Sequence, residues 1–186
     1  MGEPKLLLPW GNGSVLEHLL RQWESLQASQ LVVVCAAGAQ PMIRELDRLG
    51  FPEANRIFNA APEEGMFSSI RCAAAWPGWD SKLTHWLITL GDQPHLPAVT
   101  LQELLDFGAR NPDKICQPMR DSRRKHPVLL PRHLFAELKE TTAGDLKLFL
   151  VEHARDLSGF DCEDERLDFD MDTPEDYERL RKLYAS

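Results

Sequence analysis

The sequence predicts an α/β protein, namely a single three-layer α/β/α domain of the Rossmann-like type with a mostly parallel sheet. Short apolar segments typical of buried strands, at 31–37 and 86–90, alternate with helical patterns along most of the chain. Such alternation is typical of a sheet that helices cover on both faces. No repeat or linker interrupts the 186 residues, so we expect one domain over residues 1–186.

Capping residues and apolar spacing predict the helices. Ser14 is a good N-cap, and Glu17 three residues later completes a capping box for a helix that ends near Gln27. Further helices are expected at 41–49, 67–76, 97–108, 132–139, 146–154 and 174–184, and further strands at 56–58, 114–118 and 127–130. Residues 120–125 are expected to form a polar, mostly basic loop.

Composition excludes several classes of protein. The net charge of −8 argues against nonspecific binding to nucleic acid or to an anionic membrane surface. No apolar segment approaches the length of a membrane span, and the short run at 6–8 is too brief for a signal peptide. The cysteines are isolated, as expected of free thiols in a reducing cytoplasm, and they are Cys35, Cys72, Cys116 and Cys162. We therefore expect a cytoplasmic protein with neither a nucleic-acid nor a membrane partner.

A carboxylate follows the strand expected at 86–90. Gly91 and Asp92 end the apolar run, and Pro94 stops the chain from continuing as a strand. Ligands of open α/β sheets bind at the carboxyl ends of the strands. A carboxylate there suits Mg²⁺, which carries nucleotide phosphates. The alternative is that Asp92 only shapes the turn or caps the following helix.

A second acidic position lies near the end of the sequence. Asp170 and Asp172 are two residues apart in an extended segment and are expected to project to the same face. A carboxylate from this pair and Asp92 could share one Mg²⁺. Lys5 is a candidate phosphate ligand. The alternative is that the two aspartates are solvated members of an acidic tail and that Lys5 is an ordinary surface lysine.

Two further segments are candidates for ligand contact. Gly65, Ser68 and Ser69 lie near the start of the helix expected at 67–76, where free backbone N–H groups suit an anion or a base edge. Simple capping explains these residues equally well. His126 is either a ligand contact or the first residue of a strand. The basic run at 123–125 is either a solvated loop or a site for the phosphate of a second substrate.

Six blocks of sequence, in one order, resemble the molybdenum cofactor nucleotidyltransferase family, which has the nucleotide-diphospho-sugar transferase fold. Within that family the chain looks most like the cytidylyltransferases. The blocks span essentially the whole chain: MGEPKLLLPWG at 1–11, GMFSSI at 65–70, LGDQP at 90–94, HPVLL at 126–130, GD at 144–145 and DMDTPED at 170–176.

The resemblance implies a reaction in which the phosphate of a molybdopterin-type cofactor attacks the α-phosphate of CTP, used in preference to GTP. The products are the dinucleotide cofactor and diphosphate, and a molybdenum hydroxylase is the implied protein partner. Mg²⁺ would be held by Asp92 with Asp170 or Asp172, and Lys5 would stabilise charge on the triphosphate. The nucleotide or the pterin would be bound by Gly65, Ser68, Ser69, Gln93, Pro94, His126 and Asp145.

The chain departs from the family pattern at its start. The family begins with a strand and a loop of the form Ala-Gly-Gly/Ala-x-Ser-x-Arg-Met-Gly, and this sequence starts at the Met-Gly of that signature. In the family that strand lies inside the sheet. We therefore expect the first strand to be missing, two rows of backbone groups to be unpaired, and transferase activity of this polypeptide to be weak or absent.

Two other functions remain open. One is a nucleotidyltransferase that uses GTP or transfers to another acceptor, such as a sugar phosphate. The other is a non-catalytic protein that binds the molybdenum cofactor and delivers it to an oxidoreductase. A dinucleotide-binding dehydrogenase is not expected, because no G-x-G-x-x-G follows a strand.

Overall fold

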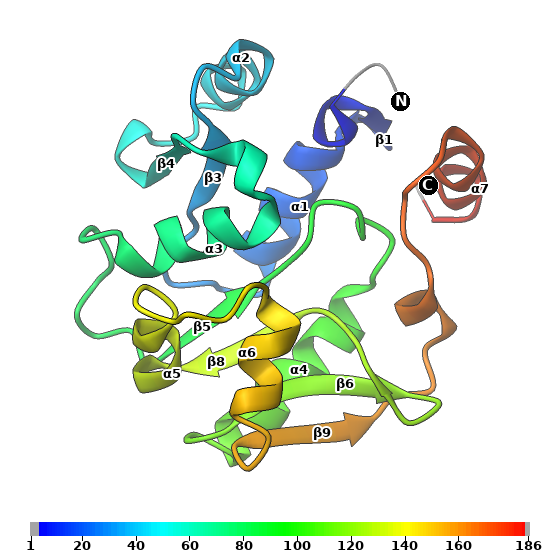
Figure 1. Ribbon diagram of the computed structural model, residues 1–186. Helices are drawn as coiled ribbons and strands as arrows, with labels where there is room; N and C mark the ends of the chain where they lie inside the picture. Colours follow the sequence, from blue (N-terminus) through cyan, green and yellow to red (C-terminus); the bar gives the residue numbers. More distant parts are fainter. Residues whose placement is uncertain (1–3, 185–186) are drawn as a thin grey trace.

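The computed structural model describes residues 4–184 and confirms the predicted α/β class (Figure 1). The helices are α1 (Val15–Ser25), α2 (Gln40–Arg48), α3 (Met66–Ala75), α4 (Ala98–Arg110), α5 (Arg132–Glu137), α6 (Leu146–Glu152) and α7 (Pro174–Tyr184). The strands are β1 (Pro9–Trp10), β2 (Gly13–Ser14), β3 (Val33–Ala36), β4 (Arg56–Asn59), β5 (His85–Ile88), β6 (Ile115–Arg120), β7 (Arg123–Arg124), β8 (Val128–Pro131) and β9 (Leu157–Asp161).

The strands that follow the β1–β2 hairpin form two separate sheets. β3 and β4 pair in parallel. The larger sheet has the order β5-β8-β6-β7, and β9 pairs in parallel with β6. Within residues 4–184, β3 is bonded to no strand other than β4, and β5 to no strand other than β8. Two strand edges are therefore open, as the sequence led us to expect.

β8 departs from the predicted parallel arrangement, because it runs antiparallel to both β5 and β6, and the short β7 is also antiparallel to β6. Only residues 121–127 connect β6 to β8. A parallel crossover needs a dozen residues or more, so this connection can only turn the chain back. The turn includes β7, so part of the expected basic loop is a short hairpin against β6.

Side chains of the larger sheet alternate between two hydrophobic cores. Trp86, Val128 and Leu130 pack with residues of α3, α5 and α6. Leu87 and Leu129 pack on the other face with residues of α4. Since successive residues of a strand point to opposite faces, this alternation puts helices on both sides of the sheet, as a three-layer arrangement requires.

The first long helix begins as predicted. The Ser14 hydroxyl oxygen accepts a hydrogen bond from the Glu17 backbone N–H at 3.1 Å. The Glu17 carboxylate does not turn back to close a capping box; it instead binds Arg21 at 2.5 Å and Arg48 at 2.6 Å. Because Arg48 lies on α2, this buried carboxylate ties the two helices together.

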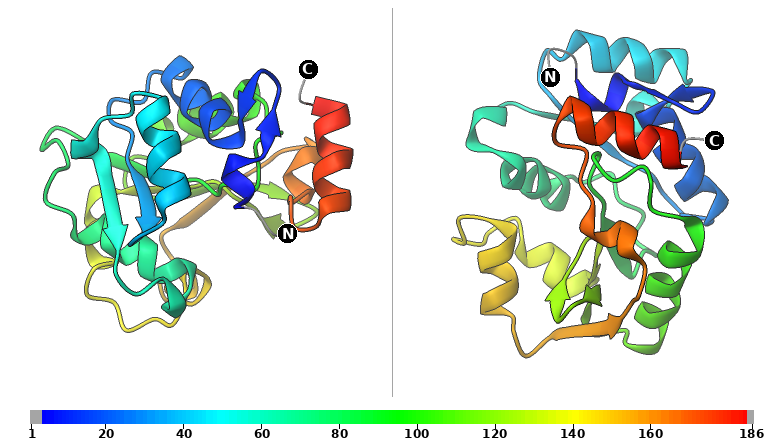
Figure 2. Two further views of the ribbon diagram at one scale, coloured as in Figure 1. Left: turned by 90° about the horizontal axis from the view of Figure 1, so that it is seen from above. Right: turned by 90° about the vertical axis from the view of Figure 1, so that its right-hand side faces the viewer.

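The two ends of the described chain lie side by side. Figure 2 shows α7 running beside the N-terminal segment. The Tyr177 hydroxyl donates a hydrogen bond to the Pro9 carbonyl at 2.6 Å. Met171, just before α7, is fully buried in one cluster with Trp10 and Val15. This packing brings residues from both ends of the sequence to one place. Among residues 4–184, no helix is both long and apolar enough to cross a membrane.

The open strand edges predict an uneven pattern of hydrogen exchange. Amides of β6 and β8, each bonded to strands on both sides, are expected to exchange on average about tenfold more slowly than those of β3 and β5. Amide exchange measured residue by residue checks this. Protection of β3 and β5 equal to that of β6 would show that their open edges are covered.

Candidate functional site

The loop after β5 is joined to the segment before α7. The Met171 backbone N–H donates to the Asp92 carbonyl at 3.1 Å. The Gln93 side-chain amide donates to the Asp170 carboxylate at 3.0 Å. Met171 points into the core between Asp170 and Asp172, as an extended segment requires. The structure thus brings together the two acidic positions that the sequence analysis singled out.

Lys5 joins the same group from the start of the described chain. It lies in a 3-10 turn, Lys5–Leu7, and its Nζ is 2.7 Å from Asp172 Oδ1. The turn is held against the loop after β5, because a Cβ on Gly91 would come within 2.7 Å of the Leu6 side chain. Residues far apart in sequence therefore lie together: Asp92, Asp170 and Asp172, which we call the carboxylate cluster, and Lys5, which contacts the cluster through Asp172.

Negative charge dominates the carboxylate cluster. Burial raises the pKa of Asp92, and the nearby charge of Asp170 raises it further, with a smaller contribution from Asp172. The ammonium of Lys5 acts in the opposite direction. Asp92 Oδ1 is buried and has no hydrogen-bond partner among the described residues. A buried carboxylate oxygen without a partner is costly, so the site favours an added cation.

The donors at this site fit a hard divalent cation that shares its coordination with a ligand. Carboxylate oxygens are the protein ligands that Mg²⁺ prefers, usually one or two of them completed by water and phosphate. No group of three His, Cys, Asp or Glu side chains within residues 4–184 is arranged to hold a metal ion alone. A cation here would therefore take part of its coordination from water or from a bound phosphate.

Helix α1 and the C-terminal segment support the loop of Asp92. Gln22 Nε2 donates to the Leu96 carbonyl at 2.6 Å. The backbone of Pro94 acts to raise the pKa of His18, so the His18 ring also lies beside this loop. His95 Nε2 lies 3.0 Å from the Arg166 carbonyl. Burial lowers the pKa of His18 and His95. The sequence analysis missed these supports, although the four-residue spacing of His18 and Gln22 places both on one helix face.

Gln93, Pro94 and His126 lie close to the carboxylate cluster. Gln93 is buried and its Oε1 has no partner among the described residues. Burial lowers the pKa of His126, and the charge of Asp170 acts to raise it, which places His126 within electrostatic reach of that carboxylate. His126 Nδ1 is also buried without a partner in the described part of the chain. These two side chains keep unused hydrogen-bonding atoms beside the cluster.

Gly65, Ser68 and Ser69 lie at the carboxyl end of β4. Gly65 precedes α3 with a φ of 87°, a conformation that favours glycine. Asn59, the last residue of β4, donates through Nδ2 to the hydroxyls of Ser68 at 2.7 Å and Ser69 at 3.0 Å. Asn59 is almost fully buried and was not singled out in the sequence. A polar residue that ends a buried strand is the signal that would have found it.

Asp145 has a local structural contact. It is the N-cap of α6, and its carboxylate accepts a hydrogen bond from the Leu148 backbone N–H at 2.7 Å. No hydrogen bond or ion pair in the described chain joins Asp145 to the carboxylate cluster. Capping is therefore the contact that the structure shows for this residue.

The basic segment at 120–125 is partly neutralised by the acidic segment that follows β9. Arg120 Nε and Lys125 Nζ each lie 2.6 Å from the Asp168 carboxylate. Arg123 and Arg124, which form β7, are exposed. The two arginines of β7 thus remain open to solvent.

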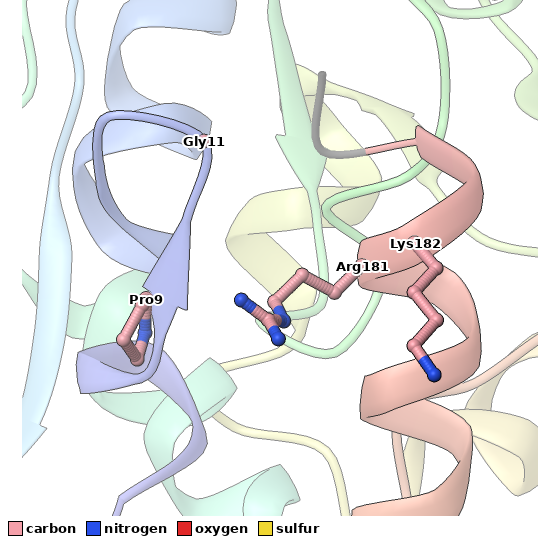
Figure 3. Close-up of a pocket in the computed structure, with 4 residues that line it drawn as sticks. All are labelled: Pro9, Gly11, Arg181 and Lys182. Carbon is pink, nitrogen blue, oxygen red and sulfur yellow. The ribbon is translucent and has the colours of Figure 1, made fainter.

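A surface pocket of about 250 Å³ lies between the β1–β2 hairpin and α7 and is lined by Pro9, Gly11, Arg181 and Lys182. Figure 3 shows Arg181 and Lys182 of α7 across from Pro9 and Gly11 of the β1–β2 hairpin. Arg181 is 3.0 Å from the Glu178 carboxylate. The pocket is lined by none of the residues of the carboxylate cluster, so we do not place the chemistry there.

Acidic residues at the end of a strand in a Rossmann-like sheet, beside a lysine, are an arrangement that suits nucleotide phosphates and a metal ion. The fold and this arrangement fit the class of nucleotidyltransferases. Residues 1–157 match the model of the MobA-like NTP transferase domain, and the chain belongs to that family.

Individual known proteins are also similar to the chain. The chain is 29% identical over 108 residues to the bifunctional protein GlmU of Cereibacter sphaeroides; the match covers 58% of this chain and 23% of that protein, so the chain spans less than a quarter of the length of this curated relative. Rv0371c of Mycobacterium tuberculosis, in a crystal structure with manganese, is 25% identical, with a TM-score of 0.67, covering 97% of this chain and 93% of that chain.

A third protein, molybdopterin-guanine dinucleotide biosynthesis protein A of Archaeoglobus fulgidus, shares the fold. It is 18% identical with a TM-score of 0.66, and the match covers 98% of this chain and 91% of that chain.

The raised pKa of Asp92 predicts that its ionised carboxylate lowers the stability of the folded protein. Because the pKa of Asp92 is higher in the folded protein than in the unfolded chain, protonation of Asp92 stabilises the fold. This stabilisation is fully present below the unfolded pKa of about 3.9 and is lost as the pH rises through the folded pKa. Asp92→Asn is therefore expected to raise the free energy of unfolding at pH 7 by about 1 kcal/mol in metal-free buffer, and by less near pH 4. Urea unfolding at both pH values measures this.

Asp113→Asn is the matched control, since Asp113 is exposed and its substitution should change the free energy of unfolding by less than about 0.5 kcal/mol. A destabilised Asp92→Asn protein at pH 7 would contradict the prediction, because it would show that the ionised carboxylate is well accommodated without a cation.

Proposed function

We propose that this chain is a Mg²⁺-dependent nucleotidyltransferase whose metal is held by Asp92 together with Asp170 or Asp172. The observation that carries the proposal is the junction of the loop after β5 with the segment before α7, which brings Asp170 and Asp172 to the loop that carries the unpartnered Asp92 Oδ1. Support for a divalent cation also comes from Rv0371c, a relative that is described in complex with manganese.

The proposed nucleotide is CTP and the proposed acceptor is a molybdopterin-type cofactor. An oxygen of the acceptor phosphate attacks the α-phosphorus of CTP, a new P–O bond forms, the bond to the β-phosphate oxygen breaks, and diphosphate leaves. Cation binding at the cluster would neutralise negative charge on the phosphates. This reaction rests on positioning and charge, so no side chain needs to form a covalent bond.

We assign the chain's own residues as follows. Lys5 binds the triphosphate, because its ammonium reaches the carboxylate cluster. Gln93 and His126 hold a substrate through Oε1 and Nδ1, the buried atoms that have no partner among the described residues. Gly65, Ser68, Ser69 and Pro94 are proposed to line the nucleotide or pterin site. Asp145, which caps α6, is proposed to face the acceptor.

GTP is the second candidate nucleotide. The observation that favours it is the name of the Archaeoglobus fulgidus protein, which refers to the biosynthesis of a guanine dinucleotide. Two further candidates are a sugar phosphate as the acceptor and delivery of the molybdenum cofactor to a molybdenum hydroxylase without nucleotide transfer. A delivery protein differs in an observable way, since it binds the cofactor without turning over a nucleotide.

Isothermal titration of the chain with CTP and with GTP, each with and without Mg²⁺, tests the proposal. We expect CTP to bind only with Mg²⁺, and Asp92→Ala to weaken this binding at least about tenfold through loss of a metal ligand. Asp113→Ala, at an exposed carboxylate, should bind as the unmodified chain does.

Three results would change the assignment. Tighter binding of GTP than of CTP would replace the nucleotide. Binding that ignores Mg²⁺ or survives Asp92→Ala would remove the proposed metal site. Binding of a molybdopterin-type cofactor without any nucleotide binding would favour the delivery protein.

A further inference from the structure

We propose that Lys5 is the internal counter-ion of the metal site: its ammonium neutralises Asp172 until a divalent cation arrives, and the cation displaces it toward the phosphates of the nucleotide. This inference rests on the proposed function, because it concerns the same carboxylate cluster. It goes further by coupling metal binding to the position of Lys5.

The charges of the surrounding residues single out Lys5. Lys5 is the cation that contacts the carboxylate cluster directly, at 2.7 Å from Asp172. Neighbouring basic side chains are paired with other carboxylates: Arg181 with Glu178, Arg179 with Asp176, and Arg120 and Lys125 with Asp168. In the described chain, no second ammonium or guanidinium forms an ion pair with Asp92, Asp170 or Asp172.

A metal ion and the Lys5 ammonium cannot both bind Asp172 without cost. Each is positive, and two cations on one carboxylate lie only a few ångströms apart, where like charges repel strongly. Asp92 Oδ1, the atom that lacks a partner, lies within electrostatic reach of both Asp172 and Lys5. A cation drawn to Asp92 therefore meets the positive charge of Lys5 before it can use Asp172.

The ion pair between Lys5 and Asp172 can separate at little cost in stability. The side chains of Lys5 and Asp172 are 34% and 67% exposed, and exposed ion pairs contribute little to stability. The backbone beside Lys5 is fixed, because Leu6 and Leu7 are packed in hydrophobic clusters and Leu6 lies against Gly91. The flexible stem of Lys5 can thus move its ammonium while the turn stays in place.

This arrangement makes metal and nucleotide binding cooperative. Each cation that displaces Lys5 frees an ammonium beside the site that the triphosphate must enter. By linkage, a nucleotide that captures the ammonium also makes Asp172 available to the metal. Lys5 is therefore expected to weaken metal binding alone and to strengthen nucleotide binding in the presence of metal.

Binding of Mn²⁺ to the full chain, followed by the electron paramagnetic resonance signal of the free ion, tests the inference without any turnover. Lys5→Gln is expected to bind Mn²⁺ about fivefold more tightly than the unmodified chain, because the competing charge is gone. Lys182→Gln is the matched control. It removes one positive charge from the pocket beside the β1–β2 hairpin and should change Mn²⁺ affinity less than about twofold.

The same variants are then titrated with CTP in the presence of Mn²⁺. Lys5→Gln should bind CTP at least about fivefold more weakly, a change opposite in sign to its effect on the metal alone. Lys5→Met, which also lacks the charge, should behave in the same way and guards against an effect particular to glutamine.

The outcomes separate this inference from the proposed function. If Mn²⁺ binds to the unmodified chain and Asp92→Asn abolishes that binding, the metal site stands. The counter-ion role is then overturned if Lys5→Gln binds Mn²⁺ no more tightly than the unmodified chain, or if Lys182→Gln gains as much Mn²⁺ affinity as Lys5→Gln. If neither the unmodified chain nor Lys5→Gln binds Mn²⁺, the metal site and the counter-ion role are both overturned.

Discussion

The backbone hydrogen bond from Met171 to Asp92, with the side-chain bond from Gln93 to Asp170 beside it, is the contact on which the site depends. It fastens an extended segment near the end of the sequence to the loop after β5. The burial of Met171 among residues of the β1–β2 hairpin and α1 then fixes the direction in which its two acidic neighbours point. Through that junction Asp170 and Asp172 lie beside the loop of Asp92, and Asp172 binds Lys5.

The loop of Asp92 is held in place by side chains to which we assign no role in metal or substrate binding. Gln22 of α1 bonds the Leu96 carbonyl in the loop of Asp92, and His95 of that loop bonds the Arg166 carbonyl. This rigid support is what allows like charges to remain close together. The hydrophobic clusters around Met171 and α1 offset the electrostatic cost, so packing maintains a site that is unfavourable on its own.

Local signals in the sequence predicted much of this arrangement. The cap of α1 at Ser14, the strand before Gly91 and the alternation around Met171 follow from short-range rules, and the structure confirms them. Long-range pairing was harder to predict. β9 contains a glycine and little alternation, and its strand character comes from pairing with β6. The reversal of β8 follows from a connection too short to cross over, and Asn59 is recognisable only once Ser68 and Ser69 are seen around it.

The contact between Lys5 and Asp172 spans 167 positions of sequence. During synthesis on the ribosome, β3, β4 and most strands of the larger sheet are therefore made before the residues that complete the carboxylate cluster. Synthesis proceeds at about 5–20 residues per second, so roughly 8 to 33 seconds separate the synthesis of Lys5 from that of its partner. A chain interrupted between β9 and residue 170 would contain every strand of the larger sheet and yet lack Asp170 and Asp172, so the carboxylate cluster is the last part of this arrangement to be synthesised.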